Sequence, residues 1–238
     1  MGAIMKLSDI WDGNNFIISK KAVRTFCKSV KLAPRYNVDE GVLGNFVPEQ
    51  IHEKSTFEKI YIITTLINSF YSTRMGADDC WNRAELLTKE HARIWPAIHK
   101  ANVKTVQYII NQQKKSKRPV GFSFTTKYFS ILSRHIAGQD IYPIYDSKVA
   151  KLLDYYFYVK NGRRGSKHSV SKFNNTNVKD YESYYTMMAE LVESCGVSYK
   201  DLDNYLWRLG TDLDNNIKGA WTSPRVDMAK VLRKIYKL

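Results

Sequence analysis

The chain contains the stretch Gly121-Phe-Ser-Phe-Thr-Thr-Lys127-Tyr-Phe-Ser-Ile-Leu and, after a short gap, Ile141-Tyr-Pro-Ile-Tyr-Asp146-Ser-Lys-Val-Ala-Lys-Leu-Leu153. A helix that starts at Ser123 places a mostly apolar stripe on one face, the period of a helix that faces a core. That stripe consists of Phe124, Tyr128, Ile131, Leu132 and His135. Pro143 prevents the first helix from continuing, and Asp146 suits the N-cap of a second helix that directs Val149, Leu152, Leu153 and Tyr156 inward. The sequence therefore predicts two successive helices, with Lys127 at the rim of the first and Asp146 at the start of the second.

Lys127 and Asp146 are 19 positions apart. This separation leaves room for one helix of about a dozen residues and a loop, so the two side chains can return to a common point. A lysine that loses its proton beside an ionised carboxylate is a recognised nucleophile arrangement. The spacing predicts that Lys127 and Asp146 form a catalytic pair.

Helical patterns recur along the rest of the chain, and strand patterns are few. We expect further helices over 56–71, 79–88, 103–111, 180–195, 199–209 and 224–236. The first of these is apolar on most faces, which predicts deep burial. Pro96 is expected to interrupt the pattern, Gly196 and Gly210 to end two helices, and Ser223 with Pro224 to begin the last one. These patterns predict an all-α fold, and we assign the ambiguous apolar run 155–159 to a helix end.

The 238 residues include 37 Lys plus Arg against 23 Asp plus Glu, which gives a net charge of +14 and a pI near 9.5. Such an excess of positive charge predicts a polyanionic partner, with nucleic acid ahead of a membrane surface. The sequence has no signal-peptide pattern and no long apolar stretch, so we expect a cytoplasmic protein that associates with the nucleoid through DNA binding. Cys27, Cys80 and Cys195 are scattered, which predicts thiols in a reducing compartment, no metal site and no iron–sulfur cluster.

Basic residues cluster on both sides of the predicted catalytic pair. One cluster precedes Lys127, and a second follows the predicted Asp146 helix. Neutralisation of phosphates supplies most of the sequence-independent affinity for DNA, and solvated loops of a basic protein are the alternative explanation for each cluster. The predicted DNA contacts are Lys114, Lys115, Lys117, Arg118, Lys148, Arg163 and Arg164, and Lys160, Lys167 and His168 belong to the second cluster.

The segment 121–153, 33 of the 238 residues, resembles the core of the helix-hairpin-helix DNA glycosylases, especially the 8-oxoguanine type. Thr126-Lys127 corresponds to the position of that family's catalytic lysine. Pro143-Ile-Tyr-Asp146-Ser-Lys-Val149 corresponds to the element that supplies its catalytic aspartate. The resemblance implies two closely packed helical subdomains with the active site in the cleft between them. It also implies one glycosylase-like unit over 1–238, divided into 55–115, 116–160 and 180–238.

Further site residues follow from the same resemblance. The family has a glycine-rich turn before the lysine, whose backbone binds a DNA phosphate; this chain has Ser123-Phe124-Thr125, so the hydroxyls of Ser123 and Thr125 are the expected phosphate ligands. A flipped base requires aromatic faces. The candidates are Phe124, Tyr128, Tyr145 and Trp207 for the base pocket, and Asn68 and Arg74 for the orphaned partner base. Core packing is the alternative for Trp207, and an ordinary helix-end polar residue is the alternative for Asn68.

The function implied is a monomeric DNA glycosylase that needs no cofactor and excises a damaged or modified base flipped out of duplex DNA. The lysine implies a Schiff-base intermediate and strand cleavage as an AP lyase. The identity of the base, and a role in repair or in defence against foreign DNA, stay open. A non-catalytic nucleic-acid-binding protein with the same fold is the main alternative. A metal-dependent nuclease is the weakest, because Asp78-Asp79 and Asp212/Asp214 are more simply turns or helix starts.

Overall fold

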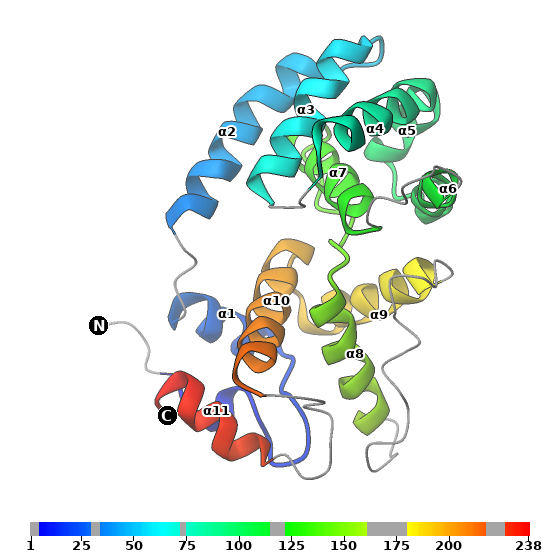
Figure 1. The fold of residues 1–238 in the computed structure, drawn as a ribbon. Helices are drawn as coiled ribbons and strands as arrows, with labels where there is room; N and C mark the ends of the chain where they lie inside the picture. The colour runs from blue at the N-terminus through cyan, green and yellow to red at the C-terminus, as the bar shows by residue number, and fades with distance from the viewer. Residues whose placement is uncertain (1–4, 30–33, 72–74, 115–121, 161–179, 218–226) are drawn as a thin grey trace. The chain divides into compact units, whose positions relative to one another are not determined.

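A computed structural model of the chain describes residues 5–29, 34–71, 75–114, 122–160, 180–217 and 227–238 (Figure 1). Within these ranges the fold is all-α, as predicted. It has eleven α-helices and one 3-10 turn, Leu7–Asp9, and no strand beyond an isolated bridge between Trp11 and Phe16.

The chain divides into two compact units. One comprises Leu32–Tyr145 and Val178–Tyr185, and the other comprises Met1–Lys31, Asp146–Asn177 and Thr186–Leu238. We call them the α7 unit and the α8 unit, after the helices Phe122–His135 and Ser147–Lys160 that contain or follow the predicted catalytic residues. The chain passes between the two units at several places. One of them is the Tyr145–Asp146 peptide bond, inside the segment 116–160 that the sequence predicts to be one element. A single glycosylase-like unit over 1–238 stays a prediction.

Helix α7 is the central helix of its unit and packs against α2, α3, α5 and α6. Ten of its 14 residues are buried. Between Phe124 and Ser133 every residue is buried except Lys127, which is partly exposed. The other helices of the unit are α2 (Pro34–Gln50), α3 (Phe57–Phe70), α4 (Ala77–Lys89), α5 (His91–His99), α6 (Val103–Lys114) and the first residues of α9 (Asp180–Cys195).

Helix α3 corresponds to the predicted helix over 56–71, but the expectation of burial on most faces is wrong. Ile60, Ile63 and Ile67 are fully buried, whereas Ile62 is 43% exposed. When apolar residues occupy both faces of a helix, the sequence has no hydrophobic periodicity, and the buried face cannot be told from the exposed one.

In the α8 unit, α10 (Tyr199–Asn216) packs against α1 (Lys20–Ser29), α8 and α11 (Met228–Tyr236). Helix α9 has the predicted range, and Gly196 follows it with a φ of 58°, the left-handed conformation expected after a helix end. The N-cap of α11 is Asp227, whose Oδ1 accepts a hydrogen bond from the Lys230 N–H at 3.0 Å. Ser223 and Pro224, the predicted start, lie outside the described residues.

Two predicted helix breaks are wrong. Helix α5 continues through Pro96. Both Pro96 and Ala92, the residue whose carbonyl lacks a donor from the proline, lie at exposed positions. Helix α10 continues through Gly210 to Asn216. A Cβ atom at Gly210 would lie 3.0 Å from the carbonyl oxygen of Lys148, so this glycine permits the close approach of α10 and α8.

We predict that Gly210→Ala lowers the free energy of unfolding by about 1–3 kcal/mol, because the added methyl group pushes on the α8 backbone. Gly41→Ala in α2 is the matched control, since a Cβ there meets nothing within 4 Å. The control should be neutral or gain up to about 1 kcal/mol. Urea unfolding of both variants measures the difference, and a Gly210→Ala protein at least as stable as wild type would contradict the close-approach explanation.

Candidate functional site

The amine of Lys127 lies against an aromatic ring at the end of α3. Its Nζ is 5.2 Å from the ring centroid of Tyr71, the C-cap residue of that helix. A ring face attracts a cation, so this contact helps to fix the position of the side chain. Lys127 is thus a partly exposed cation at a defined place on an otherwise buried helix.

A second cation, Arg83 of α4, lies beside the first turns of α7 and is only 4% exposed. Its guanidinium carbon is 4.7 Å from the ring centroid of Phe124, and its Nη1 donates a hydrogen bond to Thr125 Oγ1 at 3.3 Å. Burial lowers the pKa of Arg83 to about 9, and the Asp79 carboxylate opposes this fall, so the group is positively charged at neutral pH.

Sequence reasoning missed Arg83. The available signal was its helical register, because Cys80, Arg83, Ala84 and Leu87 form the buried face of α4 and a charged residue stands among apolar ones. A buried arginine needs partners, and here Phe124 and Thr125 of α7 provide two of them.

Thr126 connects α7 to the segment that leads to Asp146. Its Oγ1 accepts a hydrogen bond from the Tyr145 N–H at 3.0 Å and donates one to the Ser123 carbonyl at 3.0 Å. Thr126 directly precedes Lys127, and Tyr145 directly precedes Asp146. Within the α7 unit, the neighbour of one predicted catalytic residue is therefore bonded to the neighbour of the other.

Aromatic residues hold the same segment from the other side. The Tyr145 ring centroid lies 4.0 Å from that of Phe122 and 5.2 Å from that of Tyr184. The Tyr184 hydroxyl donates to the Ile144 carbonyl at 2.8 Å, and the Tyr181 hydroxyl donates to the Pro143 carbonyl at 3.3 Å. The path of residues 143–145 is thus fixed against α7 and the start of α9.

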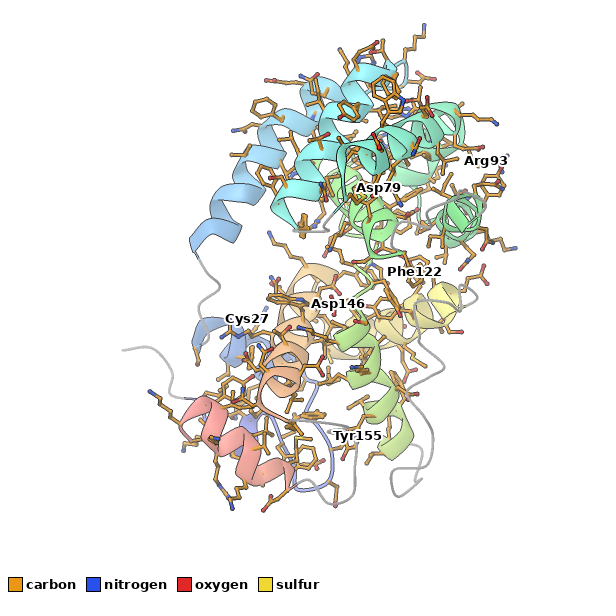
Figure 2. All side chains as sticks on the ribbon, in the orientation of Figure 1. Cys27, Asp79, Arg93, Phe122, Asp146 and Tyr155 are labelled. Carbon is orange, nitrogen blue, oxygen red and sulfur yellow. The ribbon has the colours of Figure 1, made fainter. Side chains whose placement is uncertain are left out.

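Asp146 is the N-cap of α8, as predicted (Figure 2). Its Oδ1 accepts a hydrogen bond from the Lys148 N–H at 2.8 Å, and its carbonyl accepts one from the Ala150 N–H at 2.9 Å. The side chain is partly exposed, while Val149, Leu152 and Leu153 are buried. One carboxylate oxygen of Asp146 is therefore oriented by the helix that it caps.

Three candidates for the base pocket lie in the interior. Phe124, Tyr128 and Tyr145 are 1%, 0% and 1% exposed. A base would reach their faces only after neighbouring side chains moved, and the pocket role stays a prediction. Trp207 of α10 is partly exposed.

The polar candidates differ in what they contact. Thr125 is fully buried and its hydroxyl accepts from Arg83, so the structure places this group inside the protein rather than at a surface open to phosphate. Ser123 is partly exposed. Asn68 Nδ2 donates to the Met75 carbonyl and its Oδ1 accepts from the Met75 N–H, both at 3.0 Å, so both polar atoms of its amide are bonded to the backbone of Met75. Lys148 Nζ lies 3.5 Å from Thr211 Oγ1.

Most of the predicted basic contacts lie outside the described residues. Lys114 is the last residue of α6, and its side chain is not among those described. Ser123-Phe124-Thr125, expected at the position of the family's glycine-rich turn, belong to helix α7. The residues outside are Arg74, Lys115, Lys117, Arg118, Arg163 and Arg164.

Lys127 belongs to the α7 unit and Asp146 to the α8 unit. The structure defines the surroundings of each within its own unit, and their joint action on one substrate stays a prediction. Among the described residues no three His, Cys, Asp or Glu side chains are grouped to hold a metal ion, and the three cysteines are free thiols. In the same part of the chain no helix combines the length and apolarity needed to cross a membrane.

Comparison of the chain with protein-family models, with curated proteins and with solved structures finds no match.

We predict that Thr126→Val lowers the free energy of unfolding by about 1–3 kcal/mol, because the buried Tyr145 N–H loses its acceptor while the side-chain volume is kept. The same variant should speed hydrogen exchange at the Tyr145 amide. Thr126→Ser keeps the hydroxyl and should keep that amide protected, although it loses a methyl group. Equal protection of the Tyr145 amide in wild type and Thr126→Val would show that this hydrogen bond does not hold the segment.

Proposed function

We propose that this protein is a DNA glycosylase, in which Lys127 is the nucleophile and Asp146 is the carboxylate that stabilises positive charge on the sugar. The observation that carries the proposal is the position of Lys127, the single partly exposed residue between Phe124 and Ser133 of a buried central helix. Lysine is among the residues least often placed in a protein interior, and the partial exposure of this position leaves the amine accessible on a helix that is otherwise buried.

The chemistry requires a neutral amine. The Lys127 nitrogen attacks C1′ of the deoxyribose, the C1′–N bond to the base breaks, and the bonding electrons leave with the base, which takes up a proton. Positive charge develops on the sugar as this bond breaks, and the Asp146 carboxylate stabilises it. The ammonium form of Lys127 must therefore pass its proton to solvent before attack, and the partial exposure of the side chain permits this.

Opening of the sugar ring then gives a Schiff base between Lys127 and C1′. Loss of a proton from C2′ and departure of the 3′ phosphate oxygen cleave the strand by β-elimination. Hydrolysis of the Schiff base releases the lysine amine for another turnover.

Two further observations support the proposal. The hydrogen bond between Thr126 and Tyr145 links the residues that precede Lys127 and Asp146. The net charge of +14 suits a polyanionic substrate. The resemblance of segment 121–153 to the 8-oxoguanine glycosylases makes an oxidised purine in duplex DNA the first substrate to test.

We predict that Lys127→Ala abolishes both base release and the covalent adduct trapped by borohydride. The test uses duplexes that contain 8-oxoguanine or other modified bases, with single-turnover base release and denaturing gels as readouts. Lys127→Gln should lose the adduct but keep DNA binding, because only one of many cations is removed.

Lys104→Ala, at an exposed position of α6, is the matched control and should retain both activities. Full adduct formation by Lys127→Ala would exclude Lys127 as the nucleophile. If wild-type protein bound these duplexes but released no base and formed no adduct from any of them, the protein would be the non-catalytic binding protein named as the alternative.

For Asp146→Asn we expect base release to fall by at least about 100-fold, since the charge opposite the developing cation is lost. The amide oxygen still caps α8, so the free energy of unfolding should change by no more than about 1 kcal/mol. Asp227→Asn makes the same change at the N-cap of α11 and should leave base release unchanged. Base release by Asp146→Asn within about threefold of wild type would refute the electrostatic role.

A further inference from the structure

Helix α1 has a positively charged face that the proposed chemistry does not use. Its exposed cations are Lys20, Lys21, Arg24 and Lys28. At about 100° per residue they lie within an arc of about 100°, on the side opposite the buried residues Ala22, Val23 and Phe26. Lys20, Arg24 and Lys28 are separated by single turns, so they place three charges over about 12 Å of helix.

Helix α11 repeats this arrangement at the other end of the chain. Lys230, Arg233 and Lys234 are exposed, and Met228 and Leu232 are buried on the opposite side. Lys237, the C-cap residue, is exposed as well and adds a fourth cation.

The two helices are neighbours in the α8 unit. The ring centroids of Phe26 in α1 and Tyr236 in α11 are 5.6 Å apart, both helices contact the Leu7–Asp9 turn, and both pack on α10. The eight cations of α1 and α11 therefore belong to adjacent helices whose apolar sides face a common core. We call them the α1–α11 face.

Little of this charge is neutralised locally. Lys21 Nζ lies 3.5 Å from Asp9 Oδ1, and within the described part of the chain no carboxylate is within ion-pair distance of the other seven cations. Two exposed acids lie on α11 and on α10, the helix that both α1 and α11 contact. Asp227 caps α11, and Asp201 lies in the first turn of α10.

We propose that the α1–α11 face binds the phosphate backbone of duplex DNA without regard to sequence. A lipid surface fits less well, because within the described residues Ala22, Val23, Phe26, Met228 and Leu232 on the apolar sides of the two helices are buried. The large exposed apolar residues of the described chain, Phe46, Ile62 and Trp81, all belong to the α7 unit. Closely spaced cations on two rigid helices suit a row of phosphates. This proposal concerns binding alone and holds even if the protein removes no base.

The test compares two fourfold variants of the full chain that lower the net charge equally. The face variant is Lys20→Gln, Arg24→Gln, Lys28→Gln and Arg233→Gln. The control variant is Lys54→Gln, Lys89→Gln, Lys100→Gln and Lys104→Gln, all exposed positions of the α7 unit. Affinity for an undamaged duplex of about 24 base pairs is measured between about 50 and 200 mM salt, where phosphate contacts dominate.

The face variant should bind at least about tenfold more weakly, and its slope of log affinity against log salt should flatten by about 0.9 for each lost contact. The control variant should stay within about threefold of wild type, and circular dichroism should show both folded. Replacement of the three lysines at 20, 28 and 230 by arginine should retain affinity.

Equal losses in the two variants would overturn the proposal, because total charge alone would then explain them. An unchanged slope in the face variant would also overturn it. So would a face variant that keeps its DNA affinity but loses binding to phosphatidylserine-containing vesicles, since the face would then recognise a membrane.

Discussion

The burial of α7 on nearly every side is the constraint from which the other features of the candidate site follow. A helix at the centre of its unit must bond its polar side chains internally, because water does not reach them. Thr125 accepts from Arg83, Thr126 accepts from Tyr145, and the Ser133 hydroxyl donates to the Ser130 carbonyl at 3.1 Å. The hydroxyls of α7 thereby fix a buried cation on one side and the segment 143–145 on another.

The burial of α7 is what makes Lys127 unusual. On an ordinary surface helix a lysine beside a tyrosine ring would need no explanation, whereas here the three residues before Lys127 and the six after it are all buried. Asp146 is held by different means, as the N-cap that begins α8 in the other unit. The two proposed catalytic groups are thus each fixed by secondary structure, and the Tyr145–Asp146 peptide bond is one of the places where the chain passes from one unit to the other.

The sequence predicted the elements with strong local signals. The apolar stripe of α7, the Asp146 cap and the range of α9 with Gly196 behind it all follow from neighbouring residues, whereas α7 ends at His135, before the expected break at Pro143. Non-local effects were missed. From sequence alone Gly210 is typical of a helix end, and only the structure shows that it allows α10 to approach α8 closely. The exposed position of Pro96 within α5 is likewise visible only in three dimensions. Helices α1, α2 and α5 were not predicted. The same limit applies to the site, because sequence places Thr125 near Lys127 but does not show that α7 buries it.

The most direct test of the central claim is to locate the covalent bond chemically. Wild-type protein is trapped on lesion-containing duplex with borohydride, digested with nuclease and trypsin, and analysed by mass spectrometry. A reduced sugar on Lys127 blocks cleavage there, so the account predicts a modified peptide that spans residues 118–134. A trapped sugar on any other lysine, with peptide 128–134 released normally from the adduct, would contradict the account.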